Sequence, residues 1–172
     1  MTASFLLFTL TGLALFYLEN LVLLPQVRLR LVELLIFYVG LRPAFPVAFW
    51  VAVVLGFLED SYAVTPFGLH LATNLLLVAV ARFCRRQLIL GRRGPQFLAP
   101  LVALLLQEAA WLALLPMVGV SANLSGGVWG RRLIEIVCTA ALGPLMAALM
   151  RFMEKILGRY GLAPKGRTSS LS

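Results

Sequence analysis

The sequence is poor in the side chains from which most catalytic and metal sites are built. It contains one histidine, His70, and two cysteines, Cys84 and Cys138, which lack a C-x-x-C spacing. One histidine and two separated cysteines do not supply the four ligands of a structural zinc site. The sequence also lacks a G-x-x-x-x-G-K phosphate loop, and no histidine besides His70 is available to a Ser/His/Asp grouping. We therefore expect no metal, no cofactor and no enzymatic activity.

Charged residues are also scarce, and apolar residues take their place. The chain of 172 residues is 13% charged and 61% hydrophobic, whereas soluble domains are about 25% charged and about 45–50% apolar. A soluble domain of this size exposes too much surface to hide so many apolar side chains. The net charge of +8 would suggest nucleic acid in a soluble protein, but here the basic residues lie between apolar runs. We therefore predict an all-α integral membrane protein that does not bind nucleic acid.

Six apolar segments are separated by charged residues, prolines or glycines. They cover residues 4–24, 29–41, 44–58, 66–81, 97–118 and 131–150. A spanning helix needs about 20 residues, so the second and third segments are short and form either two spans or one re-entrant hairpin. Thr65 and Pro66 are typical of the cap and first turn of a helix. We predict about six transmembrane helices in a single domain, 1–157, followed by a mobile basic tail, 158–172.

Basic residues are distributed unevenly between the two sides of such a bundle. With six spans, one side holds Arg28, Arg30, Arg131 and Arg132, and the other holds Arg42, Arg82, Arg85, Arg86, Arg92, Arg93, Arg151, Lys155, Arg159, Lys165 and Arg167. Cytoplasmic loops carry an excess of lysine and arginine, so we expect both termini in the cytoplasm. Anionic lipid would attract each nearby basic residue by about 1 kcal/mol. A cytoplasmic protein is the alternative contact for this cluster, Arg85, Arg86, Arg92, Arg93, Arg151, Lys155 and Arg159.

Small residues at four-residue spacing mark two helix faces. The first face is Ala48, Ala52 and Gly56, and the second is Thr139, Gly143 and Ala147. Small side chains let helices approach closely in lipid. The two faces therefore indicate helix contacts, either within this chain or with the transmembrane helix of a partner.

Glu108 is the ionisable residue placed deepest in an apolar segment. It lies beside Gln107 near the middle of the fifth segment, and Asn74 lies at a comparable depth in the fourth. Because a charge in the bilayer is costly, we expect Glu108 to be protonated, to face the interior or to pair with a donor such as Asn74. The alternatives are an internal polar contact, a pocket for a small ligand or ion, and a contact to another subunit.

Acidic and basic residues also alternate at the predicted outer ends of the helices. Glu135 follows Arg131 and Arg132 at helical spacing, which favours local ion pairs. We expect the same kind of anchor at the membrane interface from a second set, Glu19, Glu33, Arg28 and Arg30.

The stretch from Arg42 to His70 resembles the bacterial rod shape-determining family MreD. Members of that family typically show a helix that ends in Gly-x-x-x-Asp, and then a Pro-x-Gly that opens the next helix. The matching residues here are Gly56, Asp60, Pro66 and Gly68. Each also has a structural interpretation: Gly56 permits a close helix approach, Asp60 accepts backbone N–H bonds, and Pro66 and Gly68 start a helix.

The resemblance implies a non-enzymatic scaffold of the cell-elongation complex in the bacterial inner membrane. It implies a bundle similar to the substrate-binding subunits of energy-coupling-factor vitamin transporters. It also implies a single-span MreC-like partner, and through it MreB-like filaments and a RodA-type glycosyltransferase with its transpeptidase. The alternative function is a small-molecule, vitamin-type binding subunit of a membrane transporter.

Overall fold

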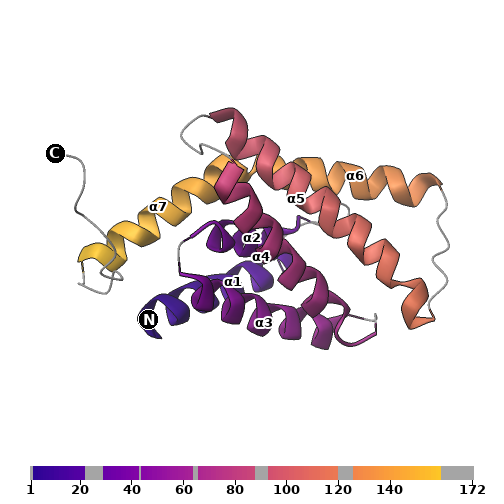
Figure 1. The fold of residues 1–172 in the computed structure, drawn as a ribbon, viewed down its shortest axis with the longest axis horizontal. Coiled ribbons are helices and arrows are strands. Elements are labelled where there is room, and N and C mark those ends of the chain that lie inside the picture. Colours follow the sequence, from indigo (N-terminus) through magenta and orange to yellow (C-terminus); the bar gives the residue numbers. More distant parts are fainter. Residues whose placement is uncertain are drawn as a thin grey trace.

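The described part of the chain is entirely helical. The computed structural model describes residues 2–21, 29–42, 44–63, 66–87, 93–119 and 126–159. The helices are α1 (Thr2–Leu21), α2 (Leu31–Gly40), α3 (Phe45–Tyr62), α4 (Leu69–Gln87), α5 (Arg93–Leu114), the 3-10 helix η1 (Pro116–Val118), α6 (Gly126–Ala141) and α7 (Gly143–Arg159) (Figure 1). The predicted all-α class is therefore confirmed.

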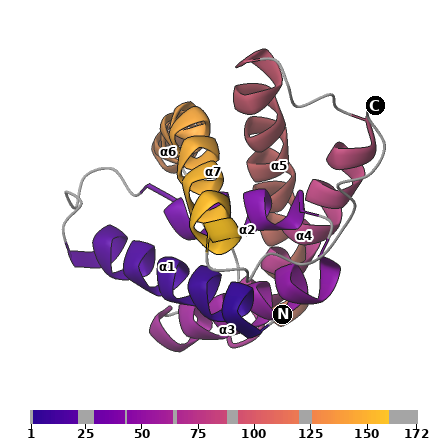
Figure 2. The same ribbon diagram turned by 90° about the vertical axis from the view of Figure 1, so that its left-hand side faces the viewer.

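Helix α2 forms the centre of the bundle. All ten of its residues are buried, and it contacts each of the other six α-helices. In Figure 2 it lies between α1 and α3 below and α5 above. Ten residues rise about 15 Å, half of the roughly 30 Å hydrocarbon core. A helix that is hydrophobic all round is typically buried, so this short helix is shielded by its neighbours rather than by lipid.

Three helices are long and apolar enough to cross a membrane, namely α1, α3 and α5. Helices α6 and α7 make a fourth span if they are counted as one bent unit, with a bend of 42° at Leu142. The prediction of one continuous sixth helix was wrong, because Pro144 has no N–H to donate to the preceding turn. Between residues 29 and 58, which were predicted as two short spans or one re-entrant hairpin, α3 reaches spanning length whereas α2 does not.

Several predicted helix ends differ from the observed ones. Helix α3 continues through Glu59 and Asp60 to Tyr62, beyond its predicted end. Helix α4 begins at Leu69, three residues after Pro66, and Thr65 lies outside the described residues. Most of the predicted tail, 160–172, also lies outside them, whereas α7 extends to Arg159.

The outside of the bundle is apolar. Large hydrophobic side chains are exposed on α1, α3, α4, α5, α6 and α7, among them Leu10, Trp50, Phe83, Leu98, Ile134 and Leu145. Burying such side chains is the main driving force of folding in water, so their exposure along these helices identifies lipid as the surrounding solvent. Together with the three spanning helices, this surface confirms a multi-pass membrane protein.

Candidate functional site

The junction between α3 and α4 is built around the carboxylate of Asp60. Its oxygens accept backbone N–H bonds from Gly68 (3.0 Å), His70 (2.8 Å) and Leu71 (3.1 Å). The first N–H groups of a helix have no partner within the helix, and their partial positive charge favours an anion. Gly68 has a φ of +96°, a conformation that side chains disfavour. Asp60 and Gly68 therefore set the starting point of α4.

Gly56 brings the two helices together one turn before Asp60. A Cβ at this position would lie 2.8 Å from the Cα of Leu71 and 3.3 Å from Nδ2 of Asn74. A distance this short to a backbone atom leaves no room for a side chain. The close approach places Asn74 next to Glu59, so that the Gly-x-x-x-Asp and Pro-x-Gly residues hold a polar contact in place.

A chain of polar contacts connects α3, α4 and α5. Nδ2 of Asn74 donates to Oε2 of Glu59 at 2.6 Å, and Nε2 of Gln107 donates to Oδ1 of Asn74 at 3.1 Å. Both amides are buried. Oε1 of Gln107 has no hydrogen-bond partner within the described residues. Buried polar groups are usually paired, so this orphan acceptor marks a site at which something further is needed.

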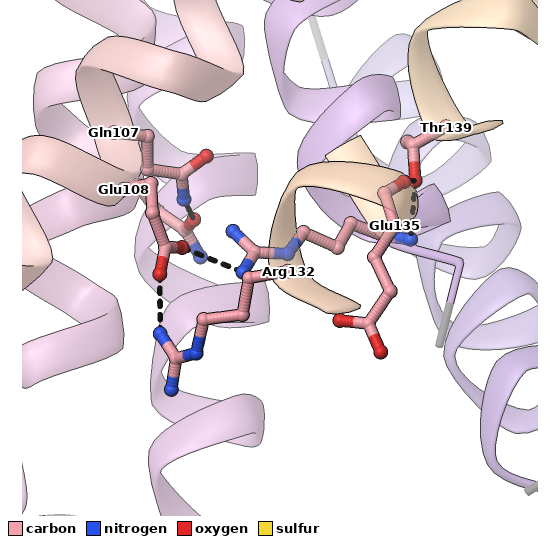
Figure 3. A network of polar contacts seen from close by, with 7 residues as sticks. Gln107, Glu108, Arg132, Glu135 and Thr139 are labelled. Carbon is pink, nitrogen blue, oxygen red and sulfur yellow. Dashed lines mark hydrogen bonds and ion pairs between the residues drawn. The ribbon is translucent and has the colours of Figure 1, made fainter. Parts of the chain in front are cut away.

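Glu108 binds two arginines from other elements. Nη2 of Arg30 donates to its Oε2 at 2.6 Å, and Nη1 of Arg132 donates to its Oε1. Figure 3 shows the carboxylate of Glu108 directed at Arg132, which reaches it from α6. The Arg132 guanidinium also lies 4.3 Å from the ring centroid of Trp111. The predicted Asn74–Glu108 contact was therefore wrong: adjacent residues on a helix point about 100° apart, and Asn74 faces Gln107.

Arg30 is held through both its backbone and its side chain. Its N–H donates to Oγ1 of Thr139 at 3.0 Å, and the same hydroxyl donates to the carbonyl of Glu135 at 2.7 Å (Figure 3). Burial disfavours the charge of Arg30, but the carboxylates of Glu33, Glu108 and Glu135 outweigh it and raise its pKa. The interface anchor predicted for Arg30 is thus an interior ion pair with α5.

The ion pair predicted along α6 is present only in part. Nε of Arg131 lies 3.2 Å from Oε1 of Glu135, one turn away, as the spacing predicts. Arg132 instead crosses to Glu108, because Arg131 and Arg132 project from different sides of α6.

These groups surround a polar cavity of about 420 Å³. It lies between the later parts of α1, α3 and α5 and the earlier parts of α2, α4 and α6. Two arginines and five carboxylates line it: Arg30, Arg132, Glu19, Glu33, Glu59, Glu108 and Glu135. Its aromatic lining consists of Phe16, Tyr62 and Trp111. Such a volume falls in the range of small-molecule sites, roughly 300–1,000 Å³.

Both predicted helix-docking faces lie inside the bundle. Ala48 and Ala52 are 1% and 0% exposed, and Gly56 packs on α4. Thr139, Gly143 and Ala147 are buried as well. The small residues do permit close packing, but the packing partners belong to the same chain. A partner's helix therefore cannot dock on either face, and that part of the hypothesis was wrong.

The basic residues predicted for lipid or cytoplasmic contact lie away from the cavity. The side chains of Arg85, Arg151, Lys155 and Arg159 are exposed. Arg92 and the side chains of Arg86 and Arg93 lie outside the described part of the structure.

The sequence predicted a pocket only as one alternative for Glu108, and it did not predict most of the residues that line the cavity. Six of the seven acidic residues are near predicted outer ends of the segments or, as with Glu108, in the outer half. Helical spacing pairs neighbouring charges along the chain, whereas the fold gathers five of these six residues, all but Asp60, around one volume. Arg30, Glu33 and Glu59 take part in it from three different elements.

Comparison with known families identifies one match that covers most of the chain. The family model described as rod shape-determining protein MreD matches residues 1–153. Curated proteins and solved structures give no match. The matched range includes all the residues that line the cavity.

Proposed function

Because the chain belongs to the MreD family of rod shape-determining proteins, we propose that it is a non-enzymatic membrane scaffold of the cell-elongation complex. Membership itself implies a role in rod shape determination. The exposed apolar side chains support a protein held within the bilayer. A scaffold also needs a surface on which a partner binds, and the two small-residue faces are occupied within the chain.

The cavity is the observation that carries the partner-binding function. It is the concave site to which six helices contribute, and concave sites with a few convergent polar groups are the usual binding sites of proteins. A buried Oε1 on Gln107 without a partner supports a site that is completed by another molecule. The partner that family membership suggests is a single-span MreC-like protein. Through it the scaffold would connect to MreB-like filaments and to a RodA-type glycosyltransferase with its transpeptidase.

Orientation in the bacterial inner membrane follows from the basic residues. The excess of lysine and arginine supports cytoplasmic termini. The cavity is lined by the C-terminal parts of α1 and α3 and the N-terminal part of α4, so it would then open on the outer side. The docking segment is accordingly the part of the partner that adjoins its membrane span on that side. The exposed arginines of α4 and α7 would contact anionic lipid or filament proteins in the cytoplasm.

A second function is favoured by the volume and polarity of the same cavity. A space of about 420 Å³ suits a vitamin-sized ligand, as in the substrate-binding subunits of energy-coupling-factor transporters. On this alternative, purified protein would carry the ligand, and depletion would cause a nutritional requirement rather than a change of shape.

The test is capture of the partner by a variant with a filled cavity. Ala63 lines the cavity, so Ala63→Trp should abolish co-purification of the MreC-like protein in mild detergent. Ala109 is exposed on α5, and Ala109→Trp is the matched control that should leave capture unchanged. In cells, Ala63→Trp should fail to restore rod shape after depletion of the native protein. Equal capture by both variants would exclude the cavity as the docking site.

A further inference from the structure

Within the cavity, Glu33 is a buried carboxylate without a partner. Its exposed fraction is 8%, so it is more than nine-tenths buried, and it lines the cavity from the first turn of α2. Within the described ranges, no hydrogen bond or ion pair reaches its carboxylate. Glu33 and Arg30 interact through their charges, but the Arg30 guanidinium donates its hydrogen bond to Glu108 instead. Leaving a buried charged group unpaired costs more free energy than leaving a neutral one.

The positive charges that line the cavity are already engaged. Both guanidiniums, of Arg30 and Arg132, bind Glu108. Glu59 receives one amide hydrogen bond from Asn74, and the charges that act on it from Glu33 are of the same sign. Among the described residues, neither Glu33 nor Glu59 therefore receives a hydrogen bond from a positively charged donor, although the charge of Glu33 acts on Arg30.

The geometry of the carboxylates disfavours a metal ion as the missing cation. Divalent metals need several oxygen ligands on one ion, and no group of three His, Cys, Asp or Glu that could hold one occurs within the described residues. An organic cation instead donates N–H hydrogen bonds in several directions, so the carboxylates that bind it need not converge on one atom. It also suits an aromatic wall, because cations are attracted to ring faces.

The cavity has such a wall and already uses it once. Phe16 and Tyr62 both line it, with ring centroids 5.3 Å apart. On the other side, the Arg132 guanidinium lies over Trp111 at 4.3 Å while it binds a carboxylate. One guanidinium is thus held between an aromatic ring and a glutamate. Glu33 and Glu59, with Phe16 and Tyr62, offer a second set of the same groups.

From this arrangement we propose that the cavity binds an alkylammonium or guanidinium group, which donates to Glu33 and lies against Phe16 and Tyr62. The source is either a lysine or arginine side chain of the partner segment or a free small amine. The assignment to a partner side chain rests on the proposed function, whereas the inference that the occupant is a cation does not. This assigns to the site a chemical class of occupant, a cation with several N–H donors.

The first arm of the test measures binding of small amines to the full chain in detergent. Agmatine and butylamine should raise the Tm of the wild-type protein, whereas neutral butyramide should not. Glu33→Gln should weaken the amine response roughly tenfold or more, because hydrogen bonds between charged groups are worth at least one such factor. Glu154→Gln is the matched control, since Glu154 is exposed and lies on α7; it should respond as the wild type does.

The second arm measures capture of the MreC-like partner by the same variants. If the source is a partner side chain, Glu33→Gln reduces capture, and so does lysine- or arginine-to-glutamine replacement in the membrane-adjacent segment of the partner. If the source is a free amine, capture is unchanged while the amine response is lost. Either result supports the cation site.

Size-exclusion profiles and the Tm without ligand report whether Glu33→Gln is folded, and Glu59→Gln serves as the second variant if it is not. The proposal is overturned if the folded variant matches the wild type in both arms. If the wild-type chain captures no partner at all, the scaffold function fails, and the amine arm still decides the cation site.

Discussion

The two ends of the helix bundle differ in how deeply their acidic side chains are buried. At the cavity end lie six of the seven acidic residues, and most of them are buried: Glu19, Glu33, Glu59, Asp60, Glu108 and Glu135. At the opposite end Glu154 is the one acidic residue, and its side chain is 57% exposed. The basic side chains there, such as Arg151 and Lys155, are exposed as well.

Arg42 shows how the second end is organised. It follows α2, donates to the carbonyl of Met150 at 3.1 Å, pairs with Glu154 at 3.1 Å and lies 4.5 Å from the Phe8 ring centroid. These contacts tie α1, α2 and α7 together. The side chain of Arg42 is 17% exposed, much like that of Arg30 (16%), but its acidic partner Glu154 is 57% exposed, whereas Glu108 is 6% exposed. The two ends therefore differ in their carboxylates, because Glu33, Asp60, Glu108 and Glu135 at the cavity end are buried. Because such burial is costly, the difference supports the proposals that the cavity end binds another molecule and that the basic end faces the cytoplasm.

The largest effect that this comparison predicts is for Glu108→Ala. The substitution leaves Arg30 and Arg132, whose side chains are 16% and 26% exposed, without their shared carboxylate. Removing one partner of a fully buried pair costs about 3–5 kcal/mol, and this is the upper end of the loss that we expect. Glu154→Ala removes an exposed partner of Arg42 and should cost about 1 kcal/mol or less. Chemical unfolding in detergent measures both. Equal losses would show that the two ends do not differ in the burial of their charges.

The next effect concerns packing, in which the two ends should be alike. A Cβ on Gly56 would lie 2.8 Å from the Cα of Leu71, and one on Gly40, at the other end, 2.8 Å from the Cβ of Ala81. Gly56→Ala and Gly40→Ala should therefore each destabilise by about 1–3 kcal/mol through overpacking. A Cβ on Gly130 would meet nothing within 4 Å, so Gly130→Ala serves as the control. A neutral Gly40→Ala would show that close packing is confined to the cavity end.

Much of this architecture could be predicted from the sequence, where a local signal determines the outcome. The scarcity of charge indicates lipid as the solvent, and the Gly56/Asp60 and Pro66/Gly68 spacing identifies the family. Gly56 and Asp60 act through contacts with the next helix along the chain, at residues 68–74, which is why their structural roles follow from their spacing.

The remainder depends on contacts between distant segments. The ten residues of α2, apolar apart from Glu33, have the same composition whether lipid or other helices surround them, so the sequence does not identify the central helix. Small residues predict a close approach but not which chain supplies the other helix. Arg30 and Glu108 are 78 residues apart, and their pairing depends on the positions of α2 and α5 in the bundle. Most of the residues that line the cavity could not be predicted for the same reason.

A smaller effect is expected where the cavity end depends on a cap. Asp60→Ala removes the acceptor of three backbone N–H groups at the start of α4. Loss of an N-terminal cap costs about 0.5–2 kcal/mol. Ser61→Ala, whose hydroxyl bonds only to the preceding turn at an exposed position, should be nearly neutral. Unfolding midpoints compare the two, and an Asp60→Ala protein as stable as Ser61→Ala would mean that water replaces the cap.

The smallest effects concern the basic end and its lipid. Arg151, Lys155 and Arg159 repeat every fourth residue on α7 and are exposed, so each substitution by glutamine should weaken anionic-lipid binding by about 1 kcal/mol or less. Native mass spectrometry of retained phosphatidylglycerol measures this, and the effect should shrink as salt rises, because exposed charges are screened. Arg131→Gln removes an exposed charge at the cavity end. If it lowers lipid retention as much as the α7 substitutions do, net charge rather than position controls lipid binding. The proposal that the basic end is the one that contacts anionic lipid would then fail.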